Sequence, residues 1–230
     1  MRLPLALLAL ALAACQPDAS APPPETTAGP PAGSPAEPTA FHGDFETADD
    51  GADDPGFAAF RDTLRAIVAR RDTTALLALV GPGARLSFGD AAGGPAGLRA
   101  MWFDGARASE SLWDVLPHVL DGGSVEEDGA FVAPSVAGLW PDHLDPFETV
   151  AVVGEAVPAY DAPGGTVIAI VSSMALPRPG PPADGWQPVT LPDGREAVLK
   201  ESAVYSPVGY RLTAWDDGDG WKLQTLLAGD

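Results

Sequence analysis

The stretch that decides the fold is "ETVAVVGEAVPAYDAPGGTVIAIVSS", residues 148–173, followed by "GWQPVTLPDGREAVLK", residues 185–200. Apolar residues recur here with a period of two, and Gly, Pro and Asp-Gly separate the short runs, which is typical of β-strands joined by tight turns. The pair Asp193-Gly194 is a hairpin signal. We therefore expect residues 147–207 to form a small antiparallel barrel.

The same residues resemble a known family. "VVGEAVPAYDAPGGTVIAIVSS" with "GWQPVTLPDGREAVL" is similar to bacterial Src-homology-3-like domains, which are found in many envelope proteins and cell-wall enzymes. Such domains often carry Asn-x-Arg on the second strand and Gly-Trp-Val or Gly-Tyr-Val near the end. This chain has Val157-Pro158-Ala159-Tyr160 and Glu196-Ala197-Val198 instead, so no family ligand is carried over.

The segment before the barrel, residues 55–146, reads as mainly helical. Asp54 can cap a helix and Pro55 suits its first position, and the apolar residues that follow recur at helical spacing up to Val68. Asp72 can cap a short helix over residues 73–80, which the sequence "GPG", residues 81–83, is expected to end. A strand over residues 84–88 follows. Further helices precede the barrel, the last of them capped by Ser109 and kinked or split by Pro117.

Residues 208–230 predict a closing hairpin around "DDGDG", residues 216–220. The overall expectation is an α+β protein with a helical region, a Src-homology-3-like barrel and this C-terminal hairpin. One option for the hairpin is to pack on the helical region. The hairpin also resembles the last strands of nuclear-transport-factor-like cone folds. On that alternative the barrel is an insertion in a discontinuous domain.

The N-terminus predicts a lipid anchor. Residues 3–14 carry no polar side chain and would span about 18 Å as a helix, which is too short to cross a bilayer of roughly 30 Å. This indicates a signal peptide over residues 1–14. Leu12-Ala13-Ala14-Cys15 resembles the lipobox of bacterial lipoprotein precursors, in which the cysteine is acylated. Gln16 after the cysteine, in place of Asp, implies the outer membrane, facing the periplasm, within the bacterial cell envelope.

Residues 15–54 predict a disordered tether. The segment is rich in Pro, Ala and acidic residues, and it has no Lys or Arg. Such a composition offers little apolar surface to repay the entropy of ordering. An EF-hand interpretation of "DFETADDGADD", residues 44–54, fails on ligand spacing.

Composition and motifs exclude several functions. The net charge of -19 disfavours binding to nucleic acid, which requires basic side chains. With Cys15, the single cysteine, committed to lipid, no thiol is left for catalysis. His42, His118 and His143 lack metal-ligand spacing, and no hydrolase motif is present. We expect a non-enzymatic protein without cofactor or metal.

The sequence thus favours a lipid-anchored recognition module for a cell-wall or protein ligand. Aromatic side chains near loops are the usual means of such binding, although packing in the core or a loop is the favoured role for each residue taken alone. The candidates are Tyr160, Trp186, Tyr205 and Tyr210. The alternative is a small-molecule binder or enzyme that uses a cone-fold cavity between the helices and the closing hairpin.

Overall fold

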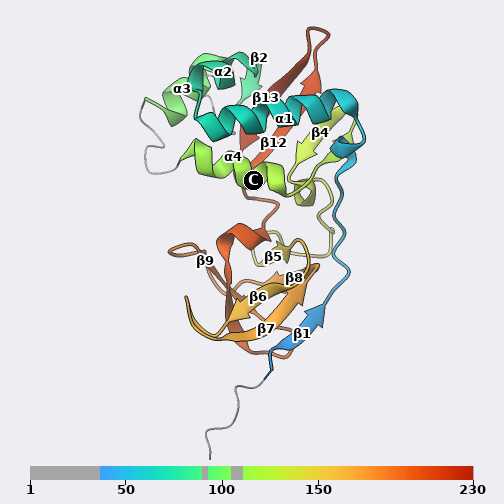
Figure 1. Ribbon diagram of the computed structural model, residues 1–230, viewed down its shortest axis with the longest axis vertical. Helices are drawn as coiled ribbons and strands as arrows, with labels where there is room; N and C mark the ends of the chain where they lie inside the picture. Colours follow the sequence, from blue (N-terminus) through green and yellow to red (C-terminus); the bar gives the residue numbers. More distant parts are fainter. Residues whose placement is uncertain (1–36, 90–92, 105–110, 230) are drawn as a thin grey trace, which may run out of the picture. The chain divides into compact units, whose positions relative to one another are not determined.

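The structure is a computed structural model that describes residues 37–89, 93–104 and 111–229. These residues form a mixed α+β fold with four α-helices and three β-sheets (Figure 1). The predicted signal peptide and Cys15 lie outside the described residues. None of the described helices is long and apolar enough to span a membrane.

One five-stranded sheet, which we call the helix-covered sheet, takes strands from both halves of the chain. Its order is β2-β13-β12-β4-β3, and β2 runs parallel to β13 while the other pairs are antiparallel. The strands are β2 (Val80–Arg85), β3 (Val125–Glu127), β4 (Ala130–Ala133), β12 (Arg211–Asp216) and β13 (Trp221–Leu227). The closing hairpin, β12 and β13, therefore completes a sheet whose other three strands, β2, β3 and β4, come much earlier in the chain.

The helices are α1 (Pro55–Arg70), α2 (Thr73–Ala78), α3 (Gly94–Trp102) and α4 (Leu112–Asp121). The side chain of Asp54 accepts a hydrogen bond of 2.7 Å from the Phe57 amide, which confirms the predicted cap of α1. Helix α4 continues through Pro117 without a break, and its N-cap is Ser111. Ser109, the predicted cap, lies outside the described residues.

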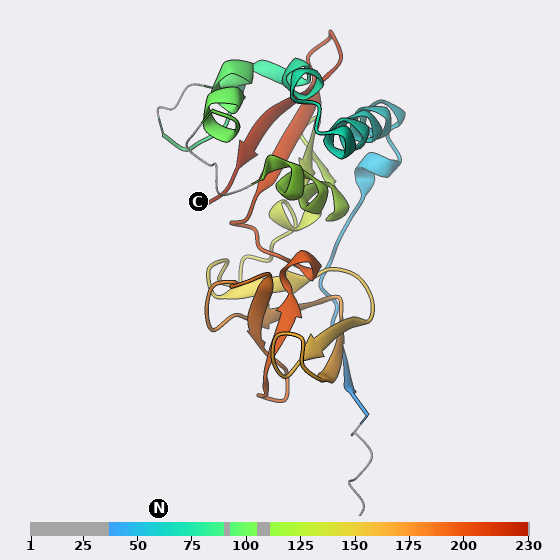
Figure 2. The same cartoon turned by 60° about the vertical axis from the view of Figure 1, so that its left-hand side comes forward.

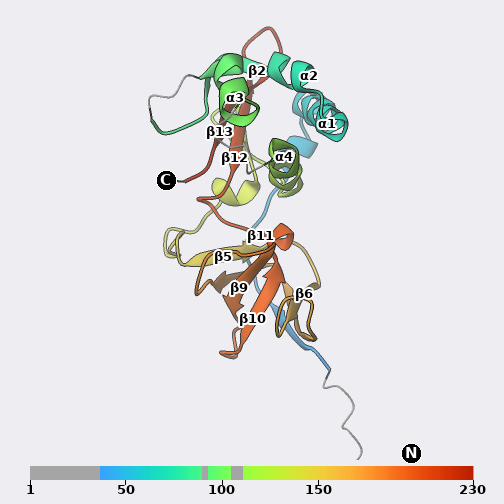
Figure 3. The same cartoon turned by 90° about the vertical axis from the view of Figure 1, so that its left-hand side faces the viewer.

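Helices α1 and α4 lie on one face of the helix-covered sheet (Figures 2 and 3). Aromatic side chains belong to the core between these helices and the sheet. The Phe57 ring stacks on Phe131 with centroids 4.2 Å apart, and Trp221 meets Phe57 edge-on at 5.3 Å. The alternative cone-fold cavity would lie between helices and hairpin. Where Trp221 of the hairpin meets Phe57 of α1, this space is filled by side chains.

The strand that was predicted at residues 84–88 lies several residues closer to the N-terminus in the structure. Strand β2 covers Val80–Arg85 and includes the Gly-Pro-Gly sequence that was expected to be a helix stop. The reason is tertiary, because β2 is held by parallel pairing with β13, where Leu223 aligns with Val80.

Two further sheets contain the strands that were predicted within residues 148–200. Their orders are β1-β7-β6-β10-β9 and β11-β5-β8. The strands are β1 (Thr39–His42), β5 (Thr149–Val152), β6 (Val157–Tyr160), β7 (Val167–Ser172), β8 (Met174–Pro177), β9 (Trp186–Thr190), β10 (Glu196–Lys200) and β11 (Val204–Tyr205). The predicted Asp193-Gly194 hairpin joins β9 to β10, with Gly194 at φ 85°. Aliphatic residues such as Val171 and Leu199 form the core of these sheets.

The expected disordered tether over residues 15–54 is wrong for its described part, residues 37–54. Strand β1 pairs in parallel with β7, and the chain continues along the fold, with a hydrogen bond of 2.8 Å from the Phe45 amide to the Ser173 carbonyl. We call residues 39–50 the N-terminal strap. Composition alone misjudges it because backbone hydrogen bonds to a sheet edge stabilise a segment with few apolar side chains.

An ion pair fixes the far end of the strap. The carboxylate of Asp49 binds the guanidinium of Arg61, which is buried in α1, and accepts a hydrogen bond of 3.1 Å from the Ser124 hydroxyl. Asp50 donates its amide to the Ser124 carbonyl at 2.9 Å. The acidic run that suggested calcium ligands thus contributes Asp49 as a partner for a buried arginine.

Candidate binding pocket

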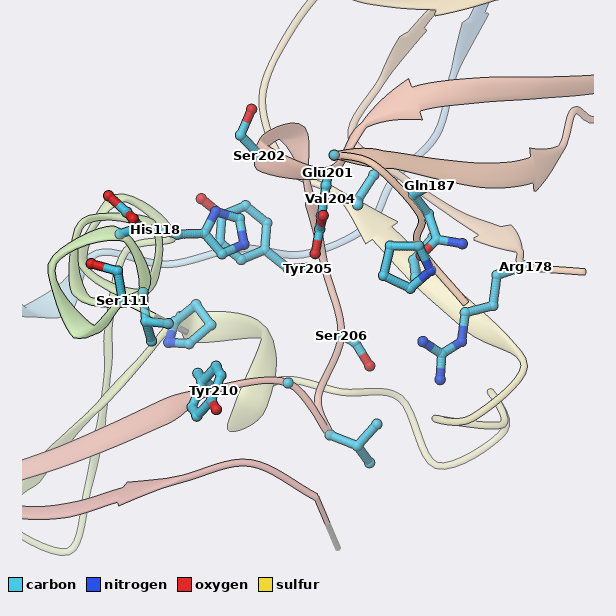
Figure 4. A pocket seen from close by; sticks show the side chains of 18 residues that line it. Ser111, His118, Arg178, Gln187, Glu201, Ser202, Val204, Tyr205, Ser206 and Tyr210 are labelled. Carbon is cyan, nitrogen blue, oxygen red and sulfur yellow. The ribbon is translucent and has the colours of Figure 1, made fainter. Parts of the chain in front are cut away.

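A pocket of about 670 Å³ is formed within the described residues by helix α4 and two segments of the later strands (Figure 4). One segment is residues 201–210, which lead from β10 through β11 to β12. The other is residues 178–187, which comprise the proline-rich loop after β8 and the first two residues of β9. Its volume lies within the range of about 300–1,000 Å³ that is typical of ligand sites.

Helix α4 contributes one face to the pocket. Ser111, Asp114, Val115 and His118 all line it, with the i, i+3, i+4 and i+7 spacing that places side chains on one side of a helix. The apolar face of the same helix, which includes Leu116 and Leu120, is buried in the core. The helix is therefore oriented by its core residues, and its polar face is presented to the pocket.

His118 and Tyr205 form an aromatic wall. Their rings stack with centroids 4.3 Å apart and an angle of 5° between the planes. Figure 4 shows the Tyr205 ring beside the His118 ring. Tyr210 also lines the pocket, on the segment that leads into β12. The ring of Tyr210 also contacts Trp102, with centroids 5.4 Å apart. The stacked rings thus form a contact between helix α4, which carries His118, and strand β11, which carries Tyr205.

The protonation of this wall is fixed by burial. Burial lowers the pKa of the His118 imidazole below its ordinary value, despite a backbone hydrogen bond with Val204 and the nearby charge of Glu201. Burial also raises the pKa of the Tyr205 phenol to about 12, assisted by the negative charge of Asp121. At neutral pH the phenol is protonated and the imidazole is mainly neutral. Both rings therefore offer apolar contact and hydrogen bonds without a net charge.

The opposite side of the pocket is built by the proline-rich loop. Gln187 is buried, and its amide nitrogen donates hydrogen bonds to the carbonyls of Gly180 at 2.9 Å and Pro188 at 2.8 Å. Arg178 donates from Nε to the Phe147 carbonyl at 2.7 Å. These bonds, with the restricted backbone of the prolines, hold the loop in one conformation.

Glu201 and Ser206 add further polar groups to the lining. The negative charge of Glu201 acts on the His118 imidazole. The Ser206 hydroxyl is buried and has no hydrogen-bond partner among the described residues. A ligand in the pocket would meet an acidic group, a hydroxyl group and an arginine around an apolar and aromatic surface.

The structure separates the predicted ligand residues into two pairs. Tyr205 and Tyr210 both line the pocket. Tyr160 and Trp186 meet edge to face at 5.3 Å, and the Lys200 ammonium lies 3.6 Å from the centre of the Trp186 ring. Gly185 and Gln187 line the pocket on either side of Trp186, whose own side chain is not part of the lining.

Sequence reasoning did not single out His118, Arg178, Glu201 or Ser206 for this pocket. The helical spacing of residues 111–118 was a usable signal for the polar face of α4. Nothing in the sequence indicated that this face would meet residues about 60 to 90 positions later. No group of three or more His, Cys, Asp or Glu in the described part of the chain has an arrangement that could hold a metal ion.

Comparison of the chain with protein-family models, with curated proteins and with solved structures finds no match.

Proposed function

We propose that this protein is a lipid-anchored lipoprotein of the bacterial outer membrane that acts as a non-catalytic recognition module for a cell-wall or protein ligand. The membrane partner is the bilayer that holds the acylated Cys15. In this proposal residues 147–207 form the Src-homology-3-like barrel that the sequence resembles, and the pocket beside β11 is the ligand site.

The observation that carries the proposal is the composition of the pocket. Its wall presents neutral His118 and Tyr205, and the pKa values of both are shifted by burial in the direction that keeps them uncharged. Aromatic surface with a few fixed polar groups is typical of recognition.

The order of the segments supports an envelope role. The predicted lipid site at Cys15 precedes residues 16–38, which lead to strand β1. Lipid acylation with several chains gives stable membrane attachment, so the folded residues would remain at the membrane while binding a ligand outside it.

The test is co-sedimentation of the chain from Gln16 onward with purified cell-wall sacculi. The first variant is Val208→Arg, which introduces a long charged side chain into the lining without removing a side-chain hydrogen bond. The control is Trp186→Ala, which removes an aromatic side chain outside the lining. Retention of the wild type and of Trp186→Ala, with loss in Val208→Arg, supports wall recognition by the pocket.

Two results would count against this proposal. Absence of retention at every salt concentration rejects the wall as the ligand and directs the search to protein partners. Equal retention of Val208→Arg and the wild type rejects the pocket as the site. Circular dichroism and thermal unfolding establish that each variant is folded.

A further inference from the structure

We infer that the pocket recognises the free terminal carboxylate of a short peptide, of the kind that the peptide chains of the cell wall carry, through Arg178 and Ser206. The inference rests on the proposed recognition function and adds the chemical group that is bound.

Arg178 is held in place before any ligand arrives. Its side chain donates from Nε to the Phe147 carbonyl at 2.7 Å, and its backbone amide donates to the Glu148 carbonyl at 2.8 Å. Within the described residues its terminal guanidinium nitrogens have no hydrogen-bond partner. A guanidinium fixed at Nε presents the remaining N–H groups as a fork, which is the geometry that suits a carboxylate.

Ser206 supplies a second donor in the same space. Figure 4 shows its hydroxyl and the Arg178 guanidinium directed toward one another across the pocket. The hydroxyl is buried without a partner among the described residues, and a buried polar group in that state is destabilising. A ligand carboxylate would accept from both groups and would remove this penalty.

The rest of the lining favours a peptide over a polyanion. Val150, Pro182 and Val204 give an apolar surface beside the Tyr205 ring, suited to small side chains. Asp114 and Glu201 add negative charge to the lining, and the whole chain carries a net charge of -19. A ligand with several phosphates would be repelled, whereas a peptide with one carboxylate at Arg178 and an amino group elsewhere is complementary.

The probes are Lys-D-Ala-D-Ala, which represents a wall peptide, Lys-Ala-Ala, which represents a protein C-terminus, and the C-terminal amide of each. Amide resonances of the chain from Gln16 onward are followed during titration to about 10 mM, which detects dissociation constants in the millimolar range. We expect the free-acid wall peptide to bind at least about tenfold more tightly than its amide, because a charged hydrogen-bonded group is lost. Inorganic phosphate is the control anion.

The variants are Arg178→Gln and Ser206→Ala, with Arg85→Gln as the charge-matched control on an exposed strand residue. Both pocket variants should lose about tenfold in affinity for the free acid and should not change affinity for the amide. Ser206→Ala should keep or raise the melting temperature, because the hydroxyl it removes has no partner. If the Ser206 hydroxyl served only to stabilise the fold, Ser206→Ala would instead lower the melting temperature.

Several outcomes overturn the inference. Equal binding of acid and amide, no binding of either peptide, or phosphate competing as well as the free acid would each reject a carboxylate site. Tighter binding of Lys-Ala-Ala than of the D-alanine peptide would reject the wall as the source. If sacculi are retained by the wild type and by Arg178→Gln alike, the carboxylate inference fails while the proposed function stands. If the free acid binds but sacculi do not, the proposed wall recognition fails and the carboxylate site stands.

Discussion

The helix-covered sheet and the two sheets that contain β5 to β11 are stabilised by different kinds of core. The first buries large aromatic side chains, among them Phe57, Phe131 and Trp102, between its strands and four helices. The second kind of core consists of Val, Ala and Leu. Small side chains suffice in the core of these two sheets, whereas a helix layer about 10 Å from a sheet leaves a volume that large rings fill.

This difference has a consequence for function. The aliphatic core contains no aromatic residue among its buried members in the described part of the chain, and Tyr160 and Trp186 are only half-buried. Tyr205 is buried in a separate small cluster with Val136 and Ala151. At the helix-covered sheet Phe57 and Phe131 are buried in the core, whereas Trp215 of β12 is exposed. The aromatic surface of the pocket comes from Tyr205 of β11 and from His118 and Tyr210, which lie on the side of the helix-covered sheet.

The largest effect that would test this comparison comes from the aromatic core. Phe57→Ala should lower the free energy of unfolding by about 3–5 kcal/mol, since a fully buried ring leaves a large cavity. Val171→Ala in the aliphatic core should cost about 2 kcal/mol, because fewer carbon atoms are lost. Denaturant unfolding measures both, and equal losses would contradict a difference between the cores.

The next effect concerns the N-terminal strap. Asp49→Ala should cost about 2 kcal/mol, because it leaves the buried Arg61 guanidinium without its carboxylate, although the exposure of Asp49 to water reduces the penalty. Glu46→Ala, a change at an exposed acidic position of the same strap, is the control. Equal unfolding midpoints for the two variants would show that the strap is not held by this ion pair.

A smaller effect depends on pH. The pKa of Tyr205 is raised to about 12 in the folded state, so the unfolded state loses its proton first as the pH rises above 10. The free energy of unfolding should then fall between pH 10 and about 12, by at most about 1.4 kcal/mol per pH unit. Tyr205→Phe should remove this part of the alkaline decline in thermal unfolding curves. An unchanged decline would assign it to other groups.

His118 gives a pH effect of the opposite sign. Burial lowers the pKa of its imidazole, so the unfolded state binds the proton more readily as the pH falls below the ordinary value of 6.5. Stability should decrease with acidification in that range. His118→Gln should flatten this part of the profile in a urea titration repeated at several pH values, while His143→Gln, in an exposed position, should leave it unchanged.

The smallest effect belongs to the outer aromatic pair. Trp186→Ala removes the contact with the Lys200 ammonium at 3.6 Å and should cost about 0.5–1 kcal/mol. Lys200→Gln should reproduce most of that loss, since it removes the same contact from the other side. A loss of several kcal/mol on Trp186→Ala would place this ring in the core and would contradict a periphery role.

Local patterns predicted much of the secondary structure. The caps at Asp54 and Asp72, the period-two strands after residue 148 and the Asp193-Gly194 turn all depend on neighbours within a few residues. The shift of β2 to Val80–Arg85 and the ordering of the strap were not predictable in this way. Both depend on pairing with strands more than 100 residues away, β13 and β7 respectively.

The sequence by itself determined the mixed α+β class, the positions of the turns and the aromatic residues available for contact, because these follow from local propensity and periodicity. Only the tertiary structure decided that the closing hairpin completes the helix-covered sheet, and that Tyr205 stacks on His118 opposite Arg178. The physical reason is that a pocket is made by side chains brought together across long chain separations, and a single sequence encodes no direct signal for such contacts.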